Sequence, residues 1–325
     1  KAVGVDIKGD TYSIAKAGYG LITLNSIRLL SLNAVSGVAN AFNGMANLYM
    51  EAAKGRKFTG EDVSKGYMNL ALGWSSTRAI ISFFDIQLDS TEWRKSFRRA
   101  SSQTMRRKLL TLERFFILQK TGDMTIQWGT LLAYLNSHTV REGKIVRKEG
   151  KEKSLFEAMS VKKGEVTLPS ISPEEFDRFR NMVKETNMQV LGQMNPYDIA
   201  RMRMTLTGAV VGQFRTWIPR MADERFGEIR YNRNLGEWEY GKYRSFFKHL
   251  VNEHFLPLIG EAIANFGILG YGTGTWGETS KQRALALFQK AKLNDPTLKI
   301  TQEEYVALHL QNLRAMLMEL YMISA

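Results

Sequence analysis

The sequence predicts a mainly α fold: an extended multi-helix assembly with a small β-hairpin insertion and short strands near residues 228–240. Three observations predict it. Apolar residues recur at steps of three and four, helix-start signals precede several of these runs, and one polar, glycine-punctuated stretch interrupts them. The chain has 325 residues, 44% hydrophobic and 24% charged. It is therefore long enough to bury a core and too apolar to be disordered.

The first helical region is predicted over residues 1–140. Within it, residues 20–54 form one helix whose only charge between Ala17 and Met50 is Arg28. Polar residues occupy one stripe of this helix, and the small residues of another stripe permit a close approach by a neighbour: Gly37, Ala41 and Gly44. A helix that is weakly polar on every side is normally enclosed by neighbours. The alternative is that residues 17–50 insert into a membrane as part of a conduit.

Further helices are predicted over residues 59–84 and 91–138, the latter with a break at residues 121–123. Residues 141–170 form a separate small β insertion, because they are polar and turn around Lys162–Gly164. Helices resume in a third region, residues 171–325. Ser172 and Thr301 each precede a glutamate by three residues, which predicts capped helix starts. Pro219 is expected to kink or end its helix.

The last helix carries a heptad-like apolar seam: Val306, Leu310, Leu313, Leu317 and Leu320. We expect this seam and the small stripe of residues 20–54 to pack against other chains, copies of this one included. The chain opens on Lys1 and ends on apolar helix formers, Met318 to Ala325. From these ends we expect a piece of a longer polypeptide.

Composition argues against several kinds of enzyme. The chain has no Cys, which excludes disulfides, thiolate metal sites and a Cys nucleophile. His249 and His254 are five residues apart, whereas a helical zinc pair of the HExxH type needs four. Neither the phosphate-binding GxxxxGK[ST] pattern nor the GxSxG nucleophile elbow occurs. We therefore predict no catalytic residue, no metal site and no cofactor, and a chain that is not an enzyme.

Positive charge is concentrated in one part of the chain. The formal net charge is +13, and residues 91–153 hold fifteen Lys and Arg against six Asp and Glu. The densest stretch has no acid: Arg94, Lys95, Arg98, Arg99, Arg106, Arg107 and Lys108. On a helix, Lys95, Arg99 and Arg106 share a face that is able to follow a phosphate backbone. The stretch predicts sequence-blind contact with DNA or an acidic surface; the alternative is a solvated or ion-paired face.

Residues 187–244 combine a Met-rich helix, a helix exit and an aromatic, acidic, glycine-rich turn. Arginines there alternate with acids such as Asp223 and Glu224, which predicts ion pairs rather than general acid and base groups. We also expect arginines to stack on Trp217, Trp238 and Tyr240. This segment resembles the large virion cargo proteins of crAss-like bacteriophages. The resemblance rests on its lead NxQxxGQMNPYD and on these residues: Phe214, Arg215, Trp217, Pro219, Arg225, Phe226, Gly227, Gly236, Gly241 and Tyr243.

The resemblance implies a structural cargo protein of a tailed-phage virion, held in the portal or tail lumen and ejected with the genome. It implies portal, tail or other virion proteins as partners, together with phage DNA and, during ejection, the host envelope. The expected location is the capsid or tail interior and then the host cell. It transfers no active site. Two alternatives stay open: a membrane-active conduit formed after ejection, or part of a virion-associated DNA- or RNA-processing enzyme.

Overall fold

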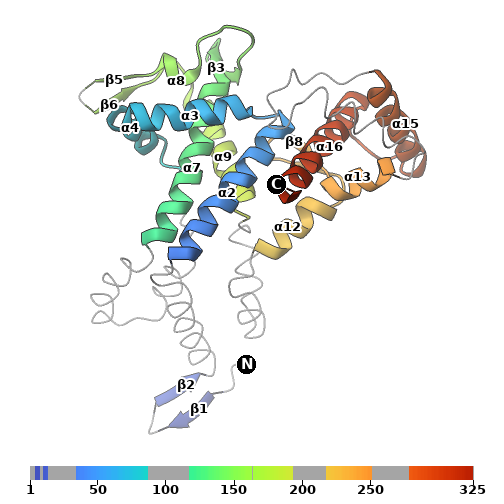
Figure 1. Ribbon diagram of the computed structural model, residues 1–325, viewed down its shortest axis with the longest axis horizontal. Helices are drawn as coiled ribbons and strands as arrows, with labels where there is room; N and C mark the ends of the chain where they lie inside the picture. Colours follow the sequence, from blue (N-terminus) through green and yellow to red (C-terminus); the bar gives the residue numbers. More distant parts are fainter. Residues whose placement is uncertain are drawn as a thin grey trace.

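The computed structural model describes residues 4–7, 10–13, 34–86, 117–162, 164–192, 217–250 and 278–324, and within them the chain is mainly helical, as predicted. The described helices form two groups (Figure 1). We call α2 to α9 with strands β3 to β6 the N-terminal body, and α12 to α16 with β7 and β8 the C-terminal body. A further hairpin, β1 (Gly4–Ile7) with β2 (Asp10–Ser13), was not predicted.

Helix α7 (Ile117–Ser137) is the axis of the N-terminal body. It packs against α2 (Ala34–Lys54), α3 (Gly60–Leu72) and α9 (Pro173–Val190), and residues 129–137 are all buried. Glycine makes two of these approaches close. A Cβ atom on Gly44 of α2 would lie 1.8 Å from Ile126 Cδ1, and one on Gly66 of α3 would lie 2.8 Å from Leu132 Cβ. The close approach expected at Gly44 is therefore made to a helix of the same chain.

Two predicted helix boundaries are wrong. The helix expected over residues 59–84 is two helices, α3 and α4 (Trp74–Phe84), which meet at Gly73. The hydroxyl of Thr77 donates to the Asn69 carbonyl across this junction, at 3.0 Å. The break expected at residues 121–123 is absent, because α7 continues through Gly122. A glycine costs a helix only about 1 kcal/mol, which burial on several sides outweighs.

The predicted β insertion contains two hairpins and a single helical turn. Strands β3 (His138–Arg141) and β4 (Lys144–Arg147) are joined by Glu142 and Gly143, whose φ angles of 52° and 76° fit a two-residue hairpin turn. Strands β5 (Ser160–Lys162) and β6 (Glu165–Thr167) flank the predicted turn. Between the hairpins, a capping box of Ser154 and Glu157 begins α8 (Leu155–Ala158), where strand was expected.

Both predicted helix caps are present, but one uses its glutamate differently. At α16 (Gln302–Ser324), the Thr301 N–H donates to Glu304 at 2.9 Å and the Glu304 N–H donates to Thr301 Oγ1 at 3.2 Å. At α9, Ser172 Oγ accepts from the Glu175 N–H at 3.2 Å. The Glu175 carboxylate, however, accepts from the Ile145 N–H of β4, at 3.2 Å. This bond joins the start of α9 to the first hairpin.

The C-terminal body follows the predicted order of elements. Helix α12 (Trp217–Phe226) leads to β7 (Arg230–Asn232), β8 (Glu237–Glu239), α13 (Lys242–Leu250), α15 (Glu278–Asn294) and α16. The short strands expected near 228–240 are thus present. Pro219 does not end its helix, since α12 runs on to Phe226.

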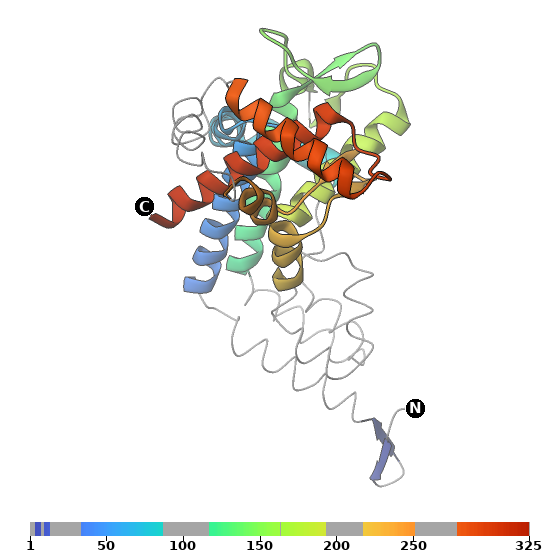
Figure 2. The same cartoon turned by 90° about the vertical axis from the view of Figure 1, so that its right-hand side faces the viewer.

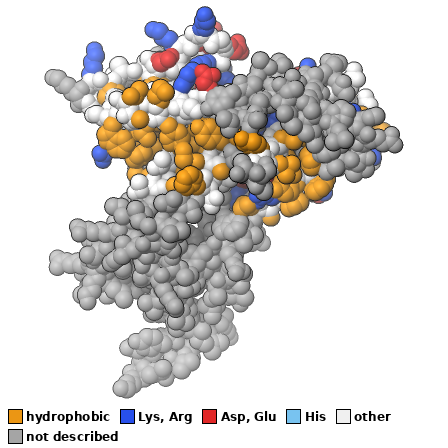
Figure 3. Space-filling model, viewed as in Figure 1, with side chains coloured by type: hydrophobic (Ala, Val, Ile, Leu, Met, Phe, Trp, Pro, Cys, Tyr) orange, Lys and Arg blue, Asp and Glu red, His pale blue; other side chains and the backbone are white. Residues whose placement is uncertain are grey.

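The heptad-like seam of α16 is divided between the interior and the surface. Leu310 and Leu313 are buried within this chain, Val306 and Leu317 are half-buried, and Leu320 is 44% exposed. Other large apolar side chains reach the surface of the N-terminal body, where a hydrophobic band lies beneath the charged hairpin end (Figure 3). Exposed members of this body are Phe42, Met68, Leu72, Trp74 and Phe83. Phe42 is exposed because the buried face of α2 carries Gly44 and Leu48 instead.

Candidate functional site

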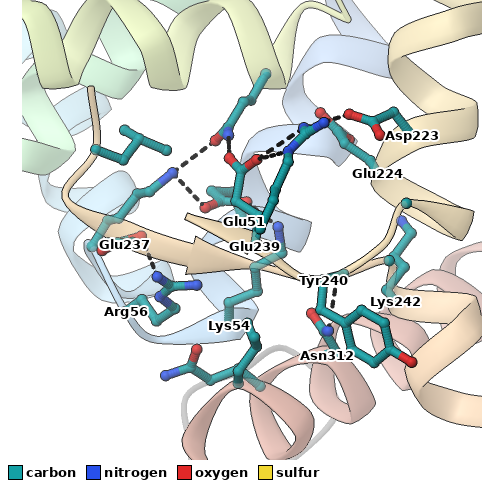
Figure 4. Close-up of a pocket in the computed structure, with 18 of the residues that line it drawn as sticks. Glu51, Lys54, Arg56, Asp223, Glu224, Glu237, Glu239, Tyr240, Lys242 and Asn312 are labelled. Atoms are coloured by element: carbon teal, nitrogen blue, oxygen red, sulfur yellow. Dashed lines mark hydrogen bonds and ion pairs between the residues drawn. The ribbon is translucent and has the colours of Figure 1, made fainter. Parts of the chain in front are cut away.

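Charged side chains gather in a small cleft where α2 ends beside α9, α12, β7, β8, α13 and α16 (Figure 4). The cleft has a free volume of about 70 Å³. Both signs of charge line it, so that no large field of one sign develops. We call this group the charged corner: Glu51, Lys54, Arg56, Lys57, Gln189, Asp223, Glu224, Arg230, Glu237, Glu239 and Lys242.

Glu51 holds the α2 side of the charged corner. Its carboxylate is 2.5 Å from Lys54 Nζ and 3.0 Å from Lys57 Nζ, and both Glu51 and Lys57 are buried. Burial raises the pKa of Glu51, but the attraction of the two ammonium groups outweighs it and holds that pKa well below its ordinary value. Glu51 is therefore ionised as a structural partner and is unsuited to carry a proton near neutral pH.

The hydrogen bonds continue from α2 through α9 to strand β8. Lys57 donates to Gln189 Oε1 at 2.8 Å, and Gln189 donates in turn to Glu239 at 2.6 Å. Glu239 also accepts from Asn232 at 2.8 Å and from Arg230 at 3.0 Å. Burial raises the pKa of Glu239, but these donors and nearby positive charge outweigh it and lower that pKa. Side chains from α9, β7, β8 and the loop after α2 thus form one connected chain.

A second carboxylate, Glu319 of α16, organises the far side of this region. It is 2.6 Å from Arg225 and 2.5 Å from Lys242, and it accepts from the Tyr243 hydroxyl at 3.0 Å. Burial raises the pKa of Glu319, but Lys242 and Arg225 outweigh it and the pKa is lowered. Burial also lowers the pKa of Lys242. Glu319 therefore ties α12 and α13 to α16.

Glu224 differs from the other carboxylates of the charged corner. Desolvation raises its pKa above the ordinary value, because the positive charges of Lys54 and Arg220 offset it only in part. Its ion pair with Arg220 Nε is long, at 3.4 Å. Asp223 instead pairs with Arg230, as the alternation of arginines and acids predicted. A single carboxylate of raised pKa is able to exchange a proton, whereas the pKa values of Glu51 and Glu239 in the same cleft are lowered, so these two stay ionised.

The motif behind the sequence resemblance forms a tight corner of the backbone. A Cβ atom on Gly241 would lie 2.6 Å from the Gly227 nitrogen, and the Gly241 N–H donates to the Gly227 carbonyl at 3.0 Å. Gly236 has a φ of 69° in the turn between β7 and β8. The Arg225 guanidinium lies 5.4 Å from the centre of the Tyr243 ring, and Phe226 meets that ring edge-on. These motif residues have a packing role.

The expected stacking of arginine on tryptophan is not what the described part of this segment shows. Trp238 meets the Tyr231 ring edge-on at 5.4 Å, and Lys248, not an arginine, lies over Tyr240. The aromatic partner of Arg225 is Tyr243. The side chain of Trp217 and the motif residues Phe214 and Arg215 lie outside the described residues, as does the basic stretch: Arg94, Lys95, Arg98, Arg99, Arg106, Arg107 and Lys108.

Sequence reasoning missed Glu51, Gln189 and Glu319. For two of them the sequence does contain a signal, which is an acidic residue in uncharged or apolar surroundings. Glu51 follows a long uncharged run, and Glu319 lies among Leu and Met residues. An acid in such surroundings is either buried with a partner or exposed on an otherwise apolar face. Gln189 carries no comparable signal, because its partners come from other elements.

His138 and His309 are both buried, one in each body. His138 Nδ1 lies 3.0 Å from the Tyr134 carbonyl oxygen, and His309 Nδ1 lies 2.9 Å from Ser245 Oγ. Among the residues that the structure describes, no three His, Asp or Glu side chains are grouped as a metal site would need. Within the same ranges, no helix has both the length and the hydropathy of a membrane span.

Comparison with known protein families, characterised proteins and solved structures finds no match.

Proposed function

We propose that this chain is a non-enzymatic structural component of a tailed-phage virion, carried in the portal or tail lumen and ejected with the genome. The observation that carries the proposal is the role of the motif on which the resemblance rests. Two of its glycines, Gly227 and Gly241, make a close backbone contact, and Arg225 and Tyr243 both donate to Glu319. A motif whose described residues pack against one another and against the last helix suits a protein whose task is to be assembled and delivered.

The ion pairing of the charged corner supports the same proposal. The carboxylates of Glu51, Glu237, Glu239 and Glu319 each have a cation or an amide within hydrogen-bonding distance. Such mutual pairing holds helices together and keeps charges from acting on a substrate. The partners we propose are therefore macromolecular: portal and tail proteins, other copies of this chain, and DNA along the basic stretch 94–108.

Local strand pairing supports passage through a narrow channel. Each of the four described sheets pairs two strands that are neighbours in sequence. A hairpin opens without separating distant parts of the chain, and local contacts form and break faster than long-range pairing. The absence of Cys also means that no disulfide would obstruct an unfolding chain.

Protease protection in purified virions tests this proposal. The chain is expected to be detectable by mass spectrometry in virions treated externally with proteinase K, and to be lost from the particles after DNA ejection is triggered. A coat protein on the outside of the same particles provides the control for protease action. Absence of the chain from purified virions, or its retention in fully emptied particles, would refute the proposal.

A further inference from the structure

The two bodies have separate apolar cores. The core of the N-terminal body is centred on α7 and includes Leu48, Leu132 and Phe179. The C-terminal body has two smaller clusters, one around Tyr305 and one around Leu313. Among the described residues, no side chain belongs to both a cluster of one body and a cluster of the other.

Polar contacts connect the bodies. Arg56, just after α2, is 2.5 Å from Glu237 and donates to the Trp238 carbonyl at 3.0 Å. Gln189 of α9 donates to Glu239, and Glu185 of α9 is 3.3 Å from Arg220. From here on, the seam means this polar boundary between the two bodies and not the apolar seam of α16. It consists of Arg56, Glu185, Gln189, Arg220, Glu237, Trp238 and Glu239.

Helix α16 also crosses α2 and contacts it (Figure 2). Charged residues approach this crossing as well, since a Cβ atom on Gly55 would lie 2.9 Å from an Arg314 guanidinium nitrogen. Further charged groups face the seam from the elements packed around it: Glu51, Lys54, Lys57, Asp223, Glu224, Arg230 and Lys242. The seam is therefore surrounded by charge on both of its sides.

Interfaces of this kind are weaker than apolar cores. Removing charges from water opposes their attraction, so an ion pair contributes little net stability compared with apolar packing. The side chains of Arg56 and Glu237 remain 18% and 25% exposed, so that solvent ions reach this pair. Salt screens such a partly exposed pair, although less than a pair on the open surface, and leaves apolar burial intact or strengthened.

We propose that the seam is a reversible joint: it opens as a unit in high salt while both bodies stay folded. This inference does not depend on the proposed function. The pKa of Glu239 is lowered by its donors and by nearby positive charge, so Glu239 is negatively charged at neutral pH, where its bonds across and within the seam are made.

The absence of Cys allows a clean test by fluorescence energy transfer. Lys144→Cys in the first hairpin and Lys290→Cys in α15 place one dye on an exposed site of each body of the 325-residue chain. Raising NaCl from 50 mM to 1 M is expected to lower transfer efficiency while far-UV circular dichroism stays constant. Arg56→Gln is expected to raise the open population about tenfold at low salt, since it removes a charged hydrogen-bond donor.

Arg141→Gln is the matched control, because it removes a two-point pair with Glu152 that lies within the N-terminal body. It is expected to leave the transfer efficiency unchanged. The salt series on the chain without Arg56→Gln keeps the test informative if that variant fails to fold. Transfer that stays constant throughout the salt series, or that falls only together with helical signal, would overturn the proposal.

Discussion

Gly44 provides a direct test of the packing of α2 on α7. In Gly44→Ala, the added Cβ would lie 1.8 Å from Ile126 Cδ1 and 2.7 Å from Cγ1. Ile126 is 1% exposed and has no solvent to turn into. An overfilled core costs about 1–3 kcal/mol. Alanine offsets about 1 kcal/mol of this through its higher helix propensity. We expect Gly44→Ala to lower the free energy of unfolding by about 0–2 kcal/mol.

Urea denaturation followed by circular dichroism measures this change, and a double-mutant cycle identifies its cause. Ile126→Val removes the Cδ1 atom of the clash and costs about 0.5–1.5 kcal/mol by itself. In the Gly44→Ala background it should cost less, with a coupling energy of about 1 kcal/mol. Asn43→Ala, at the exposed neighbouring position of α2, is the control and should be neutral or stabilising. Additive effects of Gly44→Ala and Ile126→Val would refute the reasoning.

Three further predictions concern charged and titratable groups. Burial lowers the pKa of His138 from 6.5 to about 4. The unfolded chain therefore takes up a proton first, and stability should fall by about 3 kcal/mol between pH 6.5 and pH 4. His138→Asn should reduce this dependence of the free energy of unfolding on pH, as measured by denaturation at several pH values. An unchanged dependence would assign the loss of stability to other titrating groups. Glu319→Gln leaves Arg225 and Lys242 without their carboxylate, so we expect urea denaturation to show a free energy of unfolding lower by about 3–5 kcal/mol. A decrease of less than about 1 kcal/mol would contradict the inference that Glu319 holds α12 and α13 against α16. In the basic stretch, we replace four residues with Gln: Arg98, Arg99, Arg106 and Arg107. This variant should show a weaker salt dependence of DNA binding in a filter assay. An unchanged salt dependence would assign the stretch to protein contacts.

The helical class and the helix starts were predictable because their causes are local. Ser172 and Thr301 cap their helices through residues three positions away, and this spacing is visible in sequence. The turn at Lys162–Gly164 and the strands near 228–240 were predicted for the same reason. The break at Gly73 and the continuity through Gly122 were not, because one glycine permits both outcomes and the surrounding packing selects between them.

The charged corner was predictable only in part. Alternating arginines and acids indicated ion pairs, and Asp223 with Arg230 and Glu224 with Arg220 form them. The partners that matter most for assembly lie far apart in sequence, as Arg225 and Glu319 do. No spacing rule connects such residues, so only the folded chain shows that the motif near residue 225 closes on the last helix.

The bond between Glu175 and the Ile145 N–H has a consequence for behaviour at high concentration. Two-stranded sheets have free outer edges whose N–H and C=O groups attract strands of other molecules. In β4, Ile145 is paired with Val140 and directs its own N–H outward to the carboxylate at the start of α9. The beginning of a helix thus occupies the site at which a foreign strand would add. Glu175 protects this hairpin from edge-to-edge aggregation, a risk that grows where many copies are packed into a small volume.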